Sequence, residues 1–264
     1  MKPQTFDGDQ YVNAGFFALE YNFTPKLTVI LSTRAESIYQ KINWFTNLSP
    51  LGSNEFDKLE ILPSTNIKYE LSDRQNLKFA ASKTYTLPQF KERAPFQFED
   101  ATETTFGNPD LYLSTDYNAD IKWEFFPKSN EVISVTAFGK LIQNPINEIT
   151  VASATNDISY VNTGEKAIAI GGEFEIRKNI FEIDSDNKEN LTAGFNASYM
   201  YNNQDFDGQK VTDETNLSVF FSNKEGKLTG ASDLLLNSDI SYFKEFSKER
   251  NLLATLTYNY FSDR

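Results

Sequence analysis

The chain has 264 residues, and its 25 Lys and Arg against 37 Asp and Glu give a formal net charge of -12. An acidic protein repels a phosphate backbone, so the charge predicts no nucleic-acid partner. The sequence contains neither cysteine nor histidine. This excludes disulfides, thiolate metal sites, cysteine nucleophiles and serine–histidine triads, so an enzyme would have to work with carboxylates, Lys or Tyr alone. We expect no enzyme activity, no catalytic residue, no cofactor and no metal site.

Aromatic residues make up 14% of the chain, yet its mean hydropathy is -0.48. This combination is unusual for a globular core and suits strands with one face in lipid and the other in a polar lumen. No run of about 18 consecutive apolar residues, as a membrane-spanning helix would need, is present. The polar N-terminus, Met1–Gln10, lacks the apolar core of a signal peptide. For a secreted protein this leaves either a processed chain or an excised piece of a longer protein, and we expect the excised piece.

Alternation of apolar and polar residues predicts ten long strands, and it is clearest from Leu113 to Phe125. Most of them match or exceed the roughly 9 to 11 residues that a tilted strand needs to cross a bilayer. In chain order the predicted strands are Tyr11–Phe23, Lys26–Ile38, Lys58–Glu70, Gln75–Thr86, Leu113–Phe126, Glu131–Ile142, Ala167–Ile180, Asn190–Tyr201, Leu234–Phe246 and Asn251–Phe261.

The connections between these strands alternate strictly between short and long. The short ones lie near Thr24, Ser72, Lys128, Ser185 and Lys248. The long ones are Tyr39–Asp57, Leu87–Tyr112, Gln143–Lys166 and Asn202–Asp233. Tight turns at one rim and large loops at the other are typical of outer-membrane barrels. The pattern therefore predicts an all-β protein, an antiparallel up-and-down transmembrane β-barrel.

The two faces of the predicted strands differ sharply. Aromatic residues near strand ends, such as Tyr21 and Trp123, suggest the girdles that mark the bilayer interface. If the apolar faces point outward, the interior carries a charged wall. Its predicted members are Arg34, Glu36, Lys68, Asp116, Asp120, Lys122, Glu124, Glu173, Glu175 and Arg177.

Carboxylates do not form a recognisable site in the sequence. Glu173 and Glu175 are two residues apart on a strand, so they share a face without flanking a substrate bond as a glycosidase pair would. The acidic segment Asp184–Glu189 lacks the glycine and the distal Glu of a calcium loop, and we interpret it as a solvated turn.

The long connections carry exposed aromatic residues. Loops on a rigid scaffold often carry recognition, and aromatic rings supply stacking surface for sugars or ring-bearing chelates. The alternative, that these rings pack the loops against one another, stays open. We predict ligand contacts for Trp44, Phe45, Phe96, Phe98 and Phe106, and we note Phe220 and Phe221 as similar residues.

Several motifs follow one another in the middle of the chain: Ser82–Phe96, SKTYTLPQFKERAPF, is followed by Gly107–Leu111, GNPDL, and by Tyr117–Pro127, YNADIKWEFFP. In this order they resemble TonB-dependent receptors of the Bacteroidota type. The likeness continues through VISVTAFGKLIQNPINE, Tyr160–Asn162 and GGEFEIRK, and it is specific in order and spacing over roughly residues 62–178. Leu87 and Arg93 depart from the family pattern, which often has Arg and Leu there.

The resemblance implies a barrel of about 22 strands with an N-terminal plug domain, in the bacterial outer membrane. Such a protein imports a scarce nutrient with energy passed through TonB. The implied partners are outer-membrane lipid, TonB, the plug domain and a ligand, which is a metal chelate, a vitamin, an oligosaccharide (glycan) or a peptide.

We interpret residues 1–264 as a single β-barrel segment that lacks the plug domain and the closing strand. Such a segment would form either an open, curved sheet or a smaller closed barrel. The main rival hypothesis is a soluble antiparallel β carbohydrate-binding module. A small passive pore is a third possibility.

Overall fold

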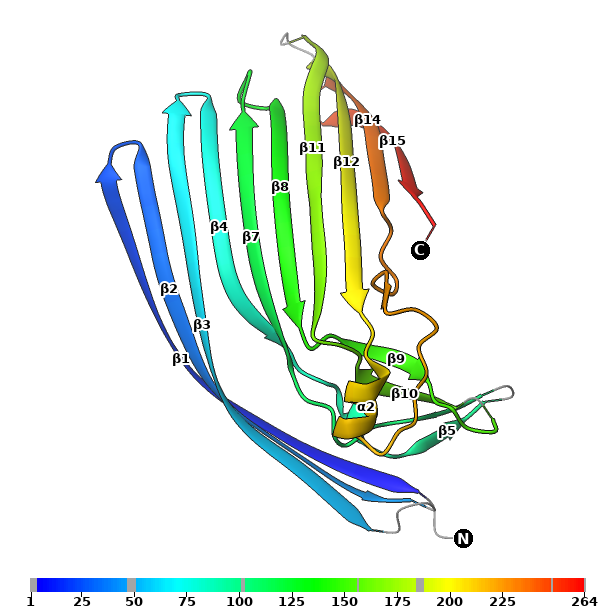
Figure 1. Cartoon of the computed structure of the whole chain (residues 1–264). Coiled ribbons are helices and arrows are strands. Elements are labelled where there is room, and N and C mark those ends of the chain that lie inside the picture. The colour runs from blue at the N-terminus through cyan, green and yellow to red at the C-terminus, as the bar shows by residue number, and fades with distance from the viewer. Residues whose placement is uncertain are drawn as a thin grey trace.

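The computed structural model describes residues 4–46, 51–100, 103–155, 157–183, 188–247 and 249–263. Ten long strands form one antiparallel sheet in which each pairs with its neighbours in chain order, which confirms the up-and-down prediction (Figure 1). They are β1 Thr5–Thr24, β2 Leu27–Phe45, β3 Gly52–Ser72, β4 Gln75–Thr86, β7 Ser114–Phe125, β8 Val132–Gln143, β11 Lys166–Ile183, β12 Glu189–Asp205, β14 Leu234–Ser247 and β15 Arg250–Phe261.

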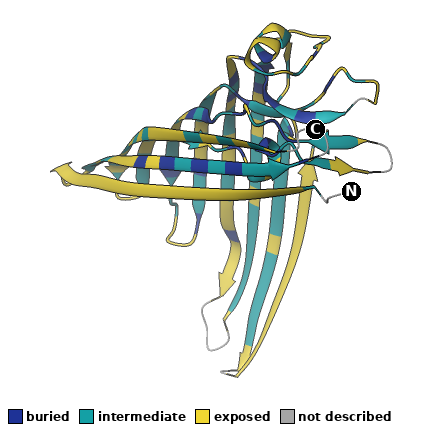
Figure 2. Cartoon of the chain, turned by 90° about the horizontal axis from the view of Figure 1, so that it is seen from below, coloured by how far each residue is buried: buried dark blue, intermediate teal, exposed yellow. Residues whose placement is uncertain are grey.

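The sheet is open and curved. Within the described residues β1 and β15 are its two edges and do not pair with each other. Figure 2 shows β1 exposed along its whole length. Of the two expected forms of a barrel segment, the structure therefore has the open sheet. No helix in the described part of the chain is long and apolar enough to cross a membrane.

Cross-strand pairing confirms that the predicted charged residues share one face. Lys68 lies directly opposite Lys78, and Lys78 lies opposite Lys122. Like charges at such positions repel. Carboxylates offset this repulsion: Lys78 Nζ lies 2.8 Å from Glu124 Oε2 and Lys68 Nζ lies 2.8 Å from Glu70 Oε1.

The other face of the sheet is apolar and exposed. Because side chains alternate along a strand, the neighbours of the charged residues point to this opposite face. No second layer of described residues covers it. Its exposed side chains include Phe17, Leu19, Leu59, Ile61, Ile121, Val135, Ile170 and Leu256.

The sheet forks toward the end that carries the long connections. The pairing of β3 with β4 stops at Ser64 and Ser82, whereas β3 stays paired with β2 as far as Gly52. The outer parts of β1, β2 and β3 thus continue as a three-stranded arm. Trp44 and Phe45 are accordingly the last residues of β2, because pairing with β1 continues to their positions. Most of the expected loop Tyr39–Asp57 is strand.

The other long connections fold into a second, smaller sheet with two short helices. Its strand order is β5-β6-β10-β9. Together with this sheet the connections cover one face of the arm, where Ile38 and Ile42 are fully buried. The short elements are α1 Phe90–Arg93, β5 Gln97–Glu99, β6 Thr104–Phe106, β9 Ile146–Thr150, β10 Ile158–Asn162, α2 Gly208–Glu214 and β13 Glu225–Gly226, the last of which pairs with β12.

The short connections join the strands at the opposite end of the sheet. The turns after Thr24 and Ser72 are each two residues long, and a third links Phe125 to Val132. The predicted turns at Ser185 and Lys248 lie outside the described residues, as does most of the acidic segment Asp184–Glu189.

Candidate ligand-binding surface

The tip of the arm holds two of the predicted ligand-contacting residues. Trp44 and Phe45 line a hollow of about 570 Å³ together with Phe6 and Leu51. Trp44 faces Gly52 across the strand pair, and a Cβ added to Gly52 would lie 2.3 Å from Trp44 Cε2. The indole therefore lies directly on the backbone of β3, and only glycine leaves room for it there.

Phe96 and Phe98 extend this aromatic surface. The ring centroids of Phe96 and Phe98 are 4.7 Å apart, and Phe96 contacts Phe6 edge-on at 5.8 Å. Phe6 is paired with Trp44 across the strands. The structure thus brings Trp44, Phe45, Phe96 and Phe98 to one region, and we call these four residues with Phe6 the tip cluster. The sequence did not single out Phe6.

Phe106 lies elsewhere. It lines a small cavity of about 180 Å³ with Gly107, Asn108 and Leu217. In the β5–β6 pair it stands opposite Gln97, whose neighbours Phe96 and Phe98 point the other way. Phe106 therefore lies apart from the other four predicted residues, and its contact with a ligand stays a prediction.

A buried arginine fixes the tip cluster to the arm. Arg93 of α1 is 1% exposed, and its guanidinium donates hydrogen bonds to Gln40 Oε1 of β2 and Asn54 Oδ1 of β3. It also donates to the carbonyl of Pro109 at 3.3 Å and lies 4.7 Å from the ring centroid of Phe56. Burial lowers the pKa of Arg93 to about 10, so it stays charged at neutral pH.

Sequence reasoning missed this role of Arg93, although it marked the residue as a departure from the family pattern. The signal that could have found it is a charged residue in a segment with several apolar neighbours, Phe90, Ala94 and Phe96. A charge in such a segment is retained in the interior when planar hydrogen-bond acceptors surround it.

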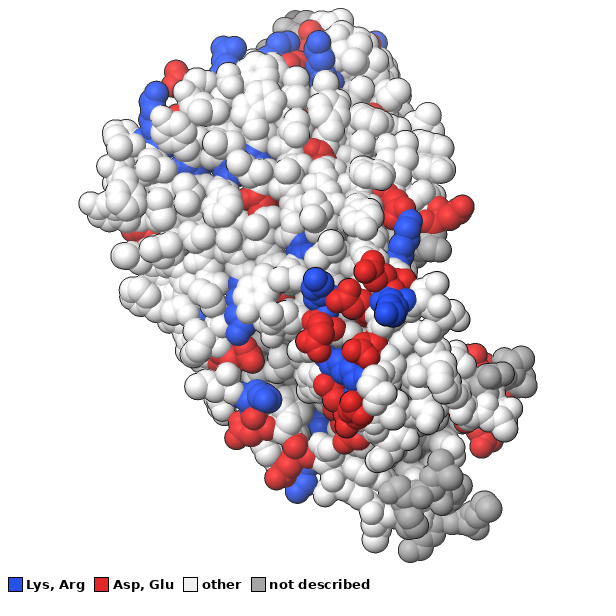
Figure 3. All heavy atoms as spheres, viewed as in Figure 1, with Lys and Arg blue, Asp and Glu red and all other residues white. Residues whose placement is uncertain are grey.

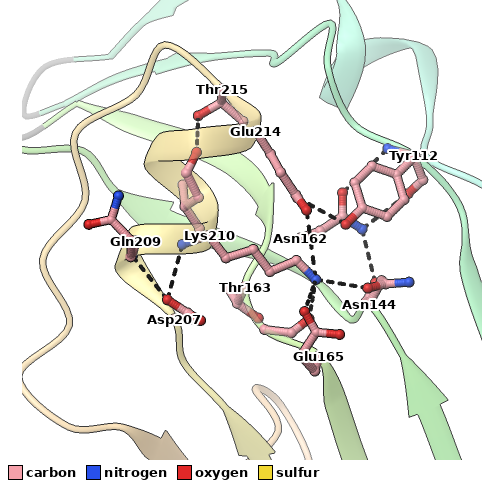
Figure 4. A network of polar contacts seen from close by, with 12 residues as sticks. Tyr112, Asn144, Asn162, Thr163, Glu165, Asp207, Gln209, Lys210, Glu214 and Thr215 are labelled. Atoms are coloured by element: carbon pink, nitrogen blue, oxygen red, sulfur yellow. Dashed lines mark hydrogen bonds and ion pairs between the residues drawn. The ribbon is translucent and has the colours of Figure 1, made fainter.

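A second polar network ties three long connections together at the base of α2 (Figure 4). Lys210 Nζ donates to Asn144 Oδ1 at 2.8 Å and to the carbonyl of Gly164 at 3.1 Å, and it forms an ion pair of 3.1 Å with Glu165. Its side chain is only 9% exposed. We call these residues, with Tyr112, Asn162 and Glu214, the Lys210 network.

Tyr112 and Asn162 connect this network to the second long connection, Leu87–Tyr112. The Tyr112 hydroxyl donates to Glu214 Oε2 at 2.9 Å, and Asn162 Nδ2 donates to the carbonyls of Tyr112 and Asn144 at 3.1 and 2.9 Å. Burial raises the pKa of Tyr112 far above its usual value, and the Glu214 hydrogen bond adds to the shift. The tyrosine therefore remains a neutral donor.

A third aromatic group lies beside α2. Phe206 and Phe221 stack with centroids 5.0 Å apart, and Phe220 next to them is 86% exposed. Phe221 packs against the buried cluster Val161, Val211 and Val219. The sequence pointed to Phe220 and Phe221, whereas it did not single out Phe206 of the same predicted connection.

The charged face forms a hollow of about 680 Å³, lined by residues that include Lys68, Lys78, Asp120, Lys122 and Glu173. Figure 3 shows how charge is distributed along the molecule on the face drawn. Charged side chains gather toward the end with the long connections, and most of the surface nearer the short turns is uncharged. Within the described residues no cluster of three or more acidic side chains is placed to hold a metal ion.

Comparisons with solved structures identify the fold. FyuA, the ferric yersiniabactin uptake receptor of Yersinia pestis, matches 98% of this chain with a TM-score of 0.64 and 11% identity. HasR of Serratia marcescens, solved with its hemophore HasA and heme, matches 96% with a TM-score of 0.63 and 12% identity. The siderophore receptor PirA of Pseudomonas aeruginosa matches 97% with a TM-score of 0.58 and 16% identity.

The match covers 35%, 46% and 49% of FyuA, HasR and PirA, so the chain spans half of their length or less. No curated protein sequence matches it significantly. A family model described as TonB dependent receptor-like, beta-barrel matches residues 2–264. The open up-and-down sheet with one charged and one apolar face is therefore a part of a bacterial outer-membrane protein, and the chain belongs to the TonB-dependent receptor β-barrel family.

Proposed function

We propose that this chain is a single β-barrel segment of an active importer that takes up a scarce nutrient through the outer membrane. The nutrient is a metal chelate, a vitamin, an oligosaccharide or a peptide. In the full-length parent protein a plug domain belongs to the same barrel, and TonB passes on the energy for import. The family consists of transporters and receptors rather than enzymes, which supports a transport role over catalysis.

One observation carries this proposal. Ten long strands place exposed apolar side chains on one face and ion-paired charges on the other, and three long connections fold together at one end only. The apolar face suits hydrocarbon and the charged face suits a wet interior. A soluble carbohydrate-binding module would need a second layer over its apolar face, and the described residues provide none.

The tip cluster supports ligand capture at the folded end. The Trp44 ring lies against the backbone at Gly52, and Arg93 fixes α1, which precedes Phe96, to the arm, so the cluster forms a preorganised apolar surface. Rigid aromatic surfaces lose little conformational entropy when a ligand binds. We assign Trp44, Phe45, Phe96 and Phe98 to this surface and leave Phe106 out of it.

The test measures uptake by the full-length parent in its own bacterium. A strain without the gene is complemented with the wild-type gene or with a Trp44→Ala, Phe98→Ala double variant. Uptake is followed for three probes: a ferric trihydroxamate chelate, cobalamin and maltohexaose. We expect gene-dependent uptake of at least one probe that stops when TonB is removed and that falls at least tenfold in the double variant.

The matched control is Phe17→Ala, which removes an exposed ring from the apolar face. This variant should keep its uptake. Gene-dependent uptake that continues without TonB would contradict active import and favour a passive pore. Unchanged uptake of all three probes in the strain without the gene would also count against the proposal.

A further inference from the structure

A pocket of about 700 Å³ lies beside α2, apart from the tip cluster. Such a volume suits a small organic ligand. The pocket has an aromatic side formed by Phe206, Phe220 and Phe221 and a polar rim with Glu165, Asp205 and Asp207. We call it the α2 pocket.

On the aromatic side two rings, those of Phe206 and Phe221, are packed in place, and the third, that of Phe220, is exposed. Phe221 packs on the buried valine cluster, and Phe206 stacks on Phe221 with an interplanar angle of 20°. A Cβ on Gly226 would lie 2.5 Å from the ring of Phe206, so that ring also lies directly against the backbone of β13. Phe220, at 86% exposed, is left with a bare ring at the pocket.

The rim is rich in hydrogen-bond acceptors. Ionised carboxylates only accept hydrogen bonds, so a ligand at this rim has to donate them. This requirement leaves two classes of ligand, one with many hydroxyl groups and one with ammonium groups. Anionic chelates and phosphates are disfavoured, because they would bring acceptors and like charge.

The charges of the rim favour the hydroxyl-rich class. Glu165 is neutralised by Lys210 at 3.1 Å, and Asp207 Oδ1 accepts hydrogen bonds of 3.0 Å from the backbone N–H groups of Gln209 and Lys210. Lys224 lines the same pocket as Asp205. Glu165 is thus compensated by a positive group and Asp207 by N–H donors, so a cationic ligand gains little at these two carboxylates, whereas rim oxygens not engaged in these contacts still accept from hydroxyls.

We propose that the α2 pocket is a binding site for a neutral oligosaccharide, in which a sugar ring stacks on Phe220 and its hydroxyl groups donate to Glu165, Asp205 and Asp207. A pyranose has an apolar C–H face and a hydroxyl-rich edge, which match these two sides of the pocket. The inference rests on the proposed import function for its physiological meaning, and it selects one of the four nutrient classes named there.

The experiment measures binding by the purified full-length protein in detergent. Isothermal titration uses four probes: maltohexaose, cellohexaose, xylohexaose and the cationic chitosan hexamer. Phe220 is exposed, so its variants should fold normally. We expect at least one neutral hexasaccharide to bind, with affinity about tenfold weaker in Phe220→Leu, which is apolar but not flat, and largely kept in Phe220→Trp. Asp205→Ala should weaken the same binding, while Phe17→Ala, on the apolar face, should leave it unchanged.

Three results would overturn the inference: no binding of any neutral hexasaccharide, binding of the chitosan hexamer alone, or equal affinity in wild type and Phe220→Leu. Because binding in detergent needs no energy source, its result is separate from uptake. TonB-dependent uptake of the chelate or of cobalamin without sugar binding would leave the import function standing and remove this inference. Sugar binding without uptake would leave this inference standing and would contradict the import function.

Discussion

Lys210 on α2 donates a 2.8 Å hydrogen bond to Asn144, a residue 66 positions earlier in the chain. This contact joins two long connections that share no strand pairing at that point. Its burial makes it costly to break, because the partners left behind would lie in a site with little access to water.

The first prediction concerns this contact. Lys210→Met removes the cation while keeping the length of the side chain, so Glu165 and Asn144 lose their partner. We expect hydrogen exchange of the α2 backbone amides, including Thr215, to accelerate at least tenfold. Lys166→Met, at an exposed position, is the control and should leave exchange unchanged. Equal exchange in both variants would show that the network does not hold α2.

Replacing Arg93 should weaken the attachment of α1 to the arm. Arg93→Met leaves Gln40 Oε1 and Asn54 Oδ1 without their donor, and we expect the free energy of unfolding to fall by about 2–3 kcal/mol. Urea unfolding in detergent, followed by Trp44 fluorescence in a Trp123→Phe background, measures it. Lys91→Met, on the exposed side of the same helix, should change stability by less than about 0.5 kcal/mol. A similar loss in both variants would contradict the role of Arg93.

Gly52 should not tolerate a side chain. A methyl group at this position would overlap the Trp44 indole, so Gly52→Ala must displace the ring from the backbone of β3. We expect a red shift of Trp44 emission and weaker ligand capture by the tip cluster. Gly139→Ala provides the comparison, because an added Cβ there meets nothing within 4 Å. The prediction fails if the two alanine variants give the same emission spectrum.

The raised pKa of Tyr112 predicts a loss of stability at high pH. Above pH 10 an unfolded tyrosine releases its proton while the folded Tyr112 keeps it, so the unfolded state binds fewer protons and stability falls as the pH rises. Tyr112→Phe removes this contribution, and its stability should decline less between pH 10 and 12. Denaturant midpoints measured across this range test the sign. A steeper decline in the variant would be inconsistent with a folded-state pKa above the usual value.

The absence of cysteine from the sequence allows a clean test of sidedness. A single cysteine at Phe220 should react with a membrane-impermeant maleimide on intact cells, since the long connections are expected outside. A cysteine at Asp73, in the short turn between β3 and β4, should react only after the outer membrane is opened. The opposite labelling pattern would reverse the assigned orientation.

The ten long strands and their order could be predicted because each strand has one face in an apolar environment and one in a polar environment. This arrangement leaves a strict alternation in the strand's own sequence, as in Leu113–Phe125. The same rule fails at the outer end of β2. Ile38 and Ile42 lie on the same face as Glu36, yet they are fully buried because the connection that contains Arg93 covers them. Apolar residues stand on the polar face there because a segment distant in sequence covers them, and the alternation is lost. The sequence therefore predicts that β2 ends at Ile38.

The short elements could not be predicted for a different reason. Strands such as β5 and β6 have three residues, too few to show a period, and α1 has one turn. Their positions depend on long-range contacts such as Ser159 Oγ donating to the carbonyl of Phe106. The aromatic residues of the site were recognised by type, but their grouping, which separates Phe106 from Phe96, follows from strand pairing alone.

The fork between β3 and β4 has a mechanical consequence. Beyond Ser64 and Ser82 no ladder hydrogen bond joins the arm to the neighbouring strand in the described residues, and the gap is bridged by side chains such as Lys83 to Glu60 at 2.8 Å. The outer part of β1–β3 is therefore held to the rest of the protein by side chains, among them the buried Ile38, Ile42 and Arg93, rather than by a row of backbone bonds. Loss of these contacts would release the arm together with its tip cluster as one unit, while the spanning strands keep their register.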